Sequence, residues 1–479
     1  LDANVCAAVA AMLESKSSEA PTGLSERQWQ RRFKAEVGVS PRQLQSVLRF
    51  RRVFDAIDGP GPPIEYAVEM RQFDPEALLA KRVEAGEVDG ALIDDLARSV
   101  ADFHAGLGPC AAIRSPCAAA RINLGEILSM DLSSALRARC DSISVSLEAM
   151  LVRLEPVFVE REREGFVREC HGDLHLANVA LVDDRPVLFD GLEFDRALRT
   201  IDVIDEIAFV YMDLLANGRR DLGHRFVNTY LEQTGDYAGV ACLRFYSIHR
   251  ALVRAKVALI RARQLGLDGA AAARIAQEIE RHVAVAEALA APRNPRLVIT
   301  CGLAGSGKTT VSGQLVELLP ALRIRSDVER KRMAGLVAAA HSRSPIGEGL
   351  YDRESSLRTY ARLAALAQAM LESGLSVIVD AAFLRRSERE PFRALAREEG
   401  IGLTTVICEA PIAVLRERVE ARMARGIDAS EADAAVLDHQ LEIHERPAGD
   451  ELEDLVVVRT DGLPAEVLIA CHAIANRRA

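Results

Sequence analysis

The segment "LVITCGLAGSGKTTVS", residues 297–312, restricts the fold of this chain more than any other stretch. An apolar run with the composition of a strand is followed by a glycine-rich turn and then by a helical pattern. Gly302, Gly307, Lys308 and Thr309 fit G-x-x-x-x-G-K-[ST], which in this strand–loop–helix context is a phosphate-binding loop. The backbone N–H groups of such a loop and the N-terminus of its helix face an anion, so the segment predicts a nucleotide site.

After this loop, short apolar runs alternate with helical patterns. The runs have the length and β-branched composition of buried strands, and they lie at 297–301, 322–326, 375–380, 403–409 and 454–458. Strands that alternate with helices form a parallel sheet with helices on both faces. We therefore expect an α/β domain over residues 297–479.

The loop is expected to wrap the phosphates of ATP. Lys308 should reach the β- and γ-phosphates, and the Thr309 hydroxyl should hold Mg²⁺. Asp380 ends a predicted strand and is the expected second carboxylate for the metal, with a plain strand-ending Asp as the alternative. The predicted nucleotide-binding residues are Gly302, Leu303, Ala304, Gly305, Ser306, Gly307, Lys308, Thr309, Thr310 and Arg418.

Asp327 ends the next predicted strand, at the carboxyl end of the sheet where ligands bind. There it could accept the proton of a substrate hydroxyl, or it could simply cap the following helix. Arg418, Arg422 and Arg425 are spaced to share one helix face, which could close over phosphates or could be a solvated basic face. Residues 426–430 could be the hinge of such a lid.

Four stretches, "GLAGSGKTT", "RSDVERKR", "VIVDAAFLRR" and "LRERVEAR", make residues 297–475 resemble small-molecule kinases of the gluconate-kinase type, close to the nucleoside-kinase fold. The resemblance implies transfer of the γ-phosphate of ATP, with Mg²⁺, to a hydroxyl of a sugar or sugar acid. It places Asp327 near the acceptor, Arg330 on the substrate side, and Arg418 and Arg422 in the lid. The expected catalytic residues are Lys308, Asp327 and Arg422.

A second motif lies at residues 170–195, "CHGDLHLANVALVDDRPVLFDGLEFD", with a hairpin expected around Asp183 and Asp184. His171, Asp173 and Asn178 fit the H-x-D-x4-N catalytic loop, and Asp190 takes the place of the metal-binding Asp of D-F-G. Residues 60–290 resemble the mainly helical C-terminal lobe of aminoglycoside phosphotransferases, which are related to protein kinases.

Kinases of that second type also need a Gly-rich loop and a strand lysine, both N-terminal to the catalytic loop. About sixty residues precede the resemblance, and they have a helical pattern without such a loop. We therefore expect this second site to be degenerate, with a ligand-binding or docking role; independent catalysis is the alternative.

Residues 24–54 resemble the second helix-turn-helix of AraC-type transcription regulators, within a predicted segment 1–58. Eight Arg or Lys against two Glu give this stretch a local charge of +6. Such charge suits contacts to DNA phosphates, with Arg31, Arg32 and Arg49 as candidates. The net charge of −10 argues against nucleic-acid binding by the chain as a whole, so a helical module retained from a gene fusion is the favoured interpretation.

Nine scattered cysteines without a C-x-x-C pair argue against a disulfide framework and a zinc site, and favour the reducing cytoplasm. No run has the roughly eighteen apolar residues of a membrane helix. Two other functions stay open at this point, a slow ATP-hydrolysing switch and a DNA-binding regulator. The oligomeric state is not predicted.

Overall fold

The computed structural model describes residues 74–265, 269–336, 352–425 and 432–477. All of them belong to one compact unit, Phe73–Ala479. The predicted helix-turn-helix segment 1–58, with Arg31, Arg32 and Arg49, lies outside the described residues. Among the described helices, none combines the length and the apolar character that crossing a bilayer requires.

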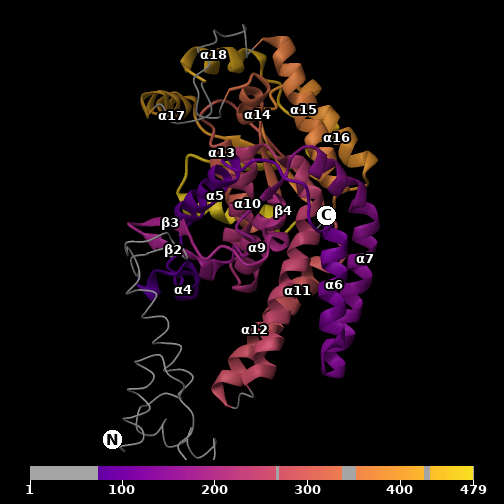
Figure 1. The fold of residues 1–479 in the computed structure, drawn as a ribbon. Helices are drawn as coiled ribbons and strands as arrows, with labels where there is room; N and C mark the ends of the chain where they lie inside the picture. The colour runs from indigo at the N-terminus through magenta and orange to yellow at the C-terminus, as the bar shows by residue number, and fades with distance from the viewer. Residues whose placement is uncertain (1–73, 266–268, 337–351, 426–431, 478–479) are drawn as a thin grey trace, which may run out of the picture. The chain divides into compact units, whose positions relative to one another are not determined.

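The first part of the unit is mainly helical, as predicted (Figure 1). Two small antiparallel sheets pair β1 with β4 and β2 with β3. The elements, in chain order, are α4 Leu79–Ala85, α5 Gly90–Ala105, α6 Pro116–Ser129, α7 Ser134–Arg163, β1 Val167–Glu169, β2 Val179–Val182, β3 Arg185–Leu188, α8 Arg196–Arg199, β4 Thr200–Asp202, α9 Val203–Ala216, α10 Arg220–Thr234, α11 Val240–Leu265 and α12 Ala270–Ala290. We call residues 74–290 the helical region.

The predicted hairpin is present at β2 and β3. Its two turn residues, Asp183 and Asp184, have φ of 49° and 59°, the left-handed values that a type I′ hairpin turn requires at both central positions. Asp tolerates this conformation better than most residues do. The turn therefore sets the register in which Val179 lies opposite Leu188.

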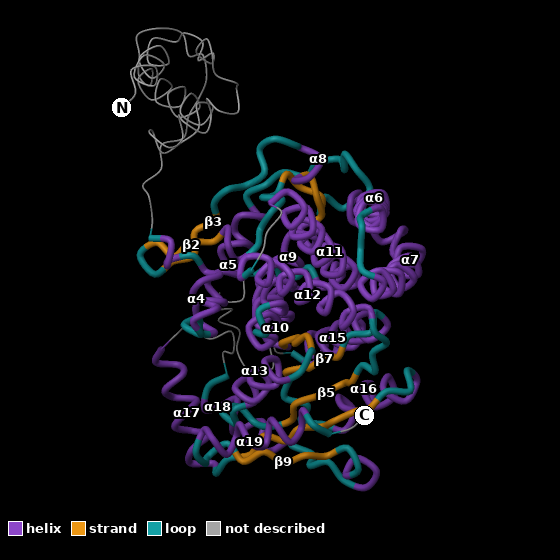
Figure 2. Tube along the Cα trace, turned by 90° about the horizontal axis from the view of Figure 1, so that it is seen from below, coloured by secondary structure: helices purple, strands orange, loops and turns teal. Residues whose placement is uncertain are grey.

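The second part, from residue 296, is the predicted α/β domain, whose five parallel strands have the order β6-β7-β5-β8-β9 (Figure 2). Each predicted strand is present, with bounds shifted by at most one residue. The elements are β5 Arg296–Cys301, α13 Lys308–Leu318, β6 Ala321–Arg325, α14 Ser326–Met333, α15 Arg353–Glu372, β7 Ser376–Asp380, α16 Arg386–Glu398, β8 Gly402–Glu409, α17 Ile412–Arg425, α18 Ala434–Ile443, β9 Leu455–Arg459 and α19 Pro464–Ala475.

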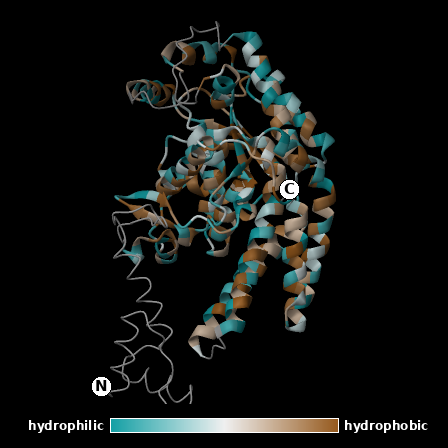
Figure 3. Cartoon of the chain, in the orientation of Figure 1, coloured by the Kyte–Doolittle hydropathy of each residue, from teal (hydrophilic) through white to brown (hydrophobic). Residues whose placement is uncertain are grey.

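Alternate residues of the strands enter two different cores. On β5, Leu297 and Ile299 join a large apolar cluster, whereas Val298 joins a smaller one with residues of α13 and α19. The large cluster runs without a break from the helical region into α15, α16 and one face of the sheet. Figure 3 shows the mixed hydropathy of helices such as α11 and α12, which is typical of helices packed on one side.

A buried ion cluster joins three elements of the helical region. Arg161 of α7 is 2% exposed, and its Nε lies 2.6 Å from Asp202 Oδ2 while its Nη2 lies 2.7 Å from Asp236 Oδ2. Each carboxylate also accepts a backbone N–H, Asp202 from Ile204 and Asp236 from Gly239. Removing one member of such a cluster leaves a buried charge without its partner.

We expect Arg161→Met to lower the free energy of unfolding by about 3–5 kcal/mol, because both carboxylates stay buried and unpaired. The matched control is Arg163→Met on the same helix, where the arginine is exposed and pairs with Glu160. Urea unfolding followed by circular dichroism measures both variants. Equal losses in the two variants would contradict this account.

Candidate functional site

The glycine-rich loop between β5 and α13 has the backbone of a phosphate-binding loop. Gly302, Gly305 and Gly307 have φ of 151°, 78° and 83°, values open mainly to glycine. Gly307 stands at the N-cap of α13 and has no side chain to cap the helix. The first N–H groups of α13 therefore remain available to an anion at the helix N-terminus.

Two of these glycines are also fixed by neighbouring backbone. A Cβ on Gly302 would lie 2.6 Å from the carbonyl oxygen of Cys408, and one on Gly305 would lie 2.7 Å from that of Leu415. Such distances are below any ordinary contact, so any larger residue here must displace β8 or α17. The sequence motif is thus explained by close packing as well as by left-handed backbone.

Lys308 stands at the first position of α13 and bends back over the loop. Its Nζ donates to the carbonyl oxygens of Gly302 at 2.9 Å and Leu303 at 2.8 Å. Burial lowers the pKa of Lys308, and the nearby Asp380 carboxylate partly opposes this effect. The ammonium group thus lies at the loop, where it can exchange carbonyl oxygens for those of a phosphate.

Asp380 ends β7 beside the loop, as predicted, and its side chain is oriented by α13. Ser312 donates from Oγ to Asp380 Oδ2 at 2.9 Å, and Asp380 is 5% exposed. Thr309, one turn earlier on the same helix, lines the cavity together with Asp380. A hydroxyl and a carboxylate are oxygen ligands of the kind that Mg²⁺ prefers, so these two side chains fit that ion.

Asp327 lies in the first turn of α14 rather than at a strand end, because β6 stops at Arg325. The N-cap of α14 is Arg325, so Asp327 is not the cap either. Its Oδ1 accepts from Arg330 Nη1 at 3.3 Å, one helical turn away. Both side chains line the cavity.

The cavity in front of the loop has a volume of about 1200 Å³ and lies at the carboxyl ends of the strands. It brings together most of the residues predicted from the sequence. From the predicted set it is lined by Ala304, Gly305, Gly307, Lys308, Thr309, Thr310, Asp327, Arg330, Asp380, Arg418 and Arg422. Gly302, Leu303 and Ser306 belong to the loop but not to this lining.

The two arginines of α17 hold different places. Arg418 donates to Gly305 O at 3.3 Å and to Thr460 O at 2.6 Å, so it fastens the loop to the segment after β9. Arg422 donates to Ala432 O at 2.8 Å and lines the cavity. The side chain of Arg425 and the predicted hinge at 426–430 lie outside the described residues.

Several residues of this site carried no sequence signal. Gln440 of α18 accepts the Ala304 N–H at 2.7 Å, and Thr460 donates from Oγ1 to Ser306 O at 2.9 Å. Ser312 could have been noticed, because it stands one turn after Thr309 on a predicted helix. Gln440 and Thr460 lie more than 130 residues from the loop that they contact, which no local pattern reports.

The second predicted site is also assembled. Asn178 Nδ2 donates to Asp173 O at 2.9 Å, and His171 Nε2 lies 2.7 Å from Phe189 O. Asp173 Oδ2 lies 3.5 Å from His175 Nε2. Asp190 is exposed and follows β3 with a φ of 61°. The structure thus brings His171, Asp173 and Asn178 together.

A buried glutamate holds the backbone of the loop that contains His171 and Asp173. Glu206 of α9 accepts the N–H groups of His171 at 2.8 Å and Gly172 at 2.7 Å. His104 links the same carboxylate to α10, with Nε2 3.3 Å from Glu206 Oε2 and Nδ1 2.8 Å from the Tyr230 hydroxyl. Glu206 had no sequence signal, since an acidic residue in a helical pattern reads as a surface residue.

We expect Gly305→Ala to lower the free energy of unfolding by about 3 kcal/mol, because left-handed strain of about 1–2 kcal/mol adds to steric overlap. Gly400→Ala is the control: its φ is 64°, but nothing lies within 4 Å of the added Cβ. The control should lose about 1–2 kcal/mol, from left-handed strain alone. Urea unfolding measures both, and equal losses would mean that the contact with Leu415 is not restrictive.

Comparison with known proteins gives a family match for the second part of the chain. A model of an AAA domain matches residues 297–447, which include the glycine-rich loop and the cavity wall. Solved structures with similar parts include a gluconokinase from Sinorhizobium meliloti 1021, 24% identical, covering 38% of this chain and 93% of that one with a TM-score of 0.29. A putative kinase from Chloroflexus aurantiacus, also 24% identical, covers 38% and 96% with a TM-score of 0.30.

Longer relatives extend into the helical region. The uncharacterized protein Rv2004c of Mycobacterium tuberculosis is 32% identical over 405 residues, which are 82% of this chain and 78% of that protein. The uncharacterized protein Mb2027c of Mycobacterium bovis matches to the same extent. Residues 297–447 thus match an AAA domain that contains the phosphate-binding loop, and the chain as a whole belongs to the family of these mycobacterial proteins.

Proposed function

We propose that the chain is a small-molecule kinase whose P-loop site transfers the γ-phosphate of ATP, with Mg²⁺, to an acceptor hydroxyl. The observation that carries this proposal is that Lys308, Thr309, Asp380 and Asp327 line one cavity. A phosphate loop alone would suit any nucleotide hydrolase. A second carboxylate in the same cavity, in addition to the one proposed for the metal, can receive an acceptor hydroxyl.

The chemical step needs little more than positioning and charge neutralisation. The acceptor oxygen attacks the γ-phosphorus, the bond from that phosphorus to the β-phosphate oxygen breaks, and ADP leaves. The acceptor proton passes to the Asp327 carboxylate. Thr309 and Asp380 would hold Mg²⁺, which would supply positive charge to the phosphate oxygens. Lys308 and Arg422 stabilise the charge that develops during transfer.

The cavity is lined by more cationic than acidic side chains, which favours an anionic acceptor. Arg330, Arg353 and Arg385 line it, together with the hydrogen-bonding side chains of Ser356 and Ser387. Guanidinium groups bind carboxylates in a bidentate manner, whereas hydroxyls satisfy sugar oxygens. Within the sugar and sugar-acid class, we therefore place sugar acids first.

The second site has its own support. Its loop is fixed by Glu206 through two backbone N–H groups, so the residues at Asp173 and Asn178 are held in place. We propose that this phosphotransferase-like loop binds a ligand and does not carry the main activity. A DNA-binding function through Arg31, Arg32 and Arg49 rests on residues outside those described, and it stays a prediction from the sequence.

Replacing Lys308 or Asp173 tests which of the two sites carries the activity. We expect Lys308→Ala to lower acceptor-stimulated ADP formation at least 100-fold, because the phosphates lose their cation. Asp173→Ala should leave the rate within about twofold. The assay is Mg²⁺-ATP consumption against a panel of sugars, sugar acids and aminoglycosides.

Two outcomes would contradict the proposal. If Asp173→Ala abolishes turnover and Lys308→Ala does not, the kinase-like loop of the helical region carries the activity. If no acceptor increases ADP formation by the wild type, while Lys308→Ala still lowers a slow basal hydrolysis, the protein is an ATP-hydrolysing switch.

A further inference from the structure

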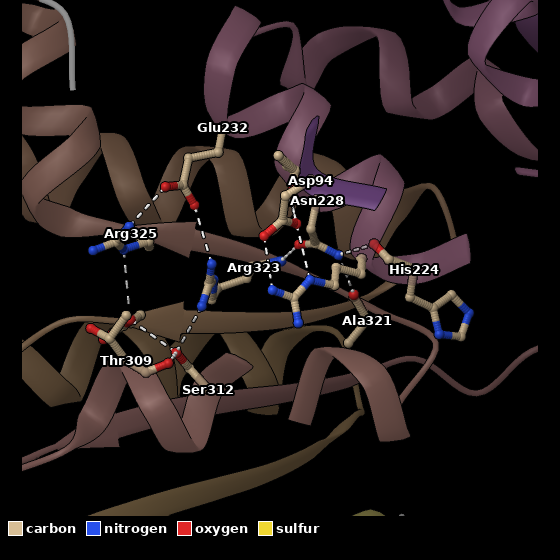
Figure 4. A network of polar contacts seen from close by, with 12 residues as sticks. Asp94, His224, Asn228, Glu232, Thr309, Ser312, Ala321, Arg323 and Arg325 are labelled. Carbon is tan, nitrogen blue, oxygen red and sulfur yellow. Dashed lines mark hydrogen bonds and ion pairs between the residues drawn. The ribbon is translucent and has the colours of Figure 1, made fainter. Parts of the chain in front are cut away.

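Two arginines of the α/β domain point at one carboxylate of the helical region. Arg323 and Arg325 lie two residues apart on β6, so they share a face of that strand. Glu232 of α10 contacts both, with Oε2 3.2 Å from Arg323 Nη2 and Oε1 2.8 Å from Arg325 Nη1. Figure 4 shows the two guanidinium groups meeting this carboxylate.

The backbone of β6 is tied to the same helix. Asn228 Oδ1 accepts the Arg323 N–H at 2.5 Å, and Asn228 Nδ2 donates to Ala321 O at 3.1 Å. β6 is an edge strand of the sheet, and an edge strand leaves backbone groups on one side without a strand partner. One asparagine side chain supplies that partner, so α10 fixes both the position of β6 and the side chains that it carries (Figure 4).

The same pair of arginines also approaches Asp380, the carboxylate proposed for Mg²⁺. Arg325 Nε lies 4.0 Å from Asp380 Oδ2, and Arg325 lines the cavity. Arg323 Nη1 lies 3.4 Å from Ser312 Oγ, which itself donates to Asp380. The two arginines therefore stand between a carboxylate of the helical region and the carboxylate proposed for Mg²⁺.

The charges in this group cancel, because the guanidinium groups of Arg323 and Arg325 face the carboxylates of Glu232 and Asp380. Burial alone would raise the pKa of Glu232, but the charges of Arg325 and Arg323 outweigh it, and the pKa is lowered. Glu232 is thus an anion in the folded protein at neutral pH. Without the Glu232 anion, both guanidinium groups would be attracted to Asp380 and would compete with Mg²⁺ for that carboxylate.

We infer that Arg325 contacts the terminal phosphoryl group of ATP and that Glu232, from the helical region, is its positioning residue. The inference rests on the proposed function, since it concerns the same cavity. It assigns the helical region a direct part in the P-loop site. An arginine that meets the transferring group stabilises charge in the transition state, and a displacement of about 1 Å is enough to lose much of that effect.

The test compares two glutamates at the same interface, between α10 and the α/β domain. Glu232→Gln removes the anion that holds Arg325. Glu317→Gln is the matched control, because Glu317 of α13 lies 2.6 Å from Arg225 of α10 and does not contact Arg325 or Asp380 in the described contacts. Both variants lose an ion pair between the same two parts of the chain.

The main measurement is calorimetric binding of ADP and of a non-hydrolysable ATP analogue, which differ in the terminal phosphate. We expect Glu232→Gln to weaken the analogue about three- to tenfold relative to ADP, since Arg325 is no longer held beside the terminal phosphate. Glu317→Gln should keep the wild-type ratio. In the kinase assay, kcat should fall about tenfold in Glu232→Gln only, and Glu232→Asp should recover part of it.

Each alternative outcome has a definite meaning. Equal affinity ratios in the two variants would overturn the positioning role and leave Glu232 as an interface residue. If Glu232→Gln fails to fold, Arg325→Lys takes its place, and an unchanged ratio in that variant also overturns the inference. A wild type that binds both nucleotides but has no acceptor-stimulated turnover contradicts the proposed function while the affinity ratios still decide the role of Glu232.

Discussion

A parallel sheet has to be covered on both faces, and this requirement organises the described part of the chain. One face is covered within the α/β domain by α13 and α19. The other face joins α15 and α16 to an apolar cluster that continues into the helical region. Strands buried on both sides read as unbroken apolar runs, as "LVITC" does. The two parts of the chain thus share a core, and the charged groups of α10 that face the α/β domain are partly buried and paired.

Much of the second part could be predicted from the sequence because its signals are local. The motif from Gly302 to Thr309, the apolar runs and the strand-ending Asp380 all depend on near neighbours, and the structure places them at one end of one sheet. The hairpin at Asp183 and Asp184 was also found, because two adjacent aspartates between apolar runs favour a turn. Asp327 was predicted at the end of a strand but lies in helix α14. Strand β6 already ends at Arg325, where its pairing with β7 ends, and composition does not show this limit.

The residues that sequence reasoning missed act over long distances. Glu232 lies in a helix with an ordinary amphipathic pattern, and only the packing of α10 against the edge strand reveals its contact with Arg325, 93 residues later. Glu206 was missed for the same reason: its two N–H donors come from a loop 34 and 35 residues earlier. Charged residues in amphipathic helices are usually solvated, so composition argues against their burial. The predicted domain boundary near residue 291 likewise gave no sign that α10 packs against the α/β domain.

Helix α10 gives this arrangement a consequence for any attempt to divide the chain. Tyr230 reaches the loop of His171 and Gly172 through His104 and Glu206, while Glu232, two residues on, holds the arginines of β6. A cut at residues 291–295 would leave two half-buried arginines on one fragment and their glutamate on the other. One helix supports both sites, so residues 74–290 and the α/β domain form one unit and not two separable ones.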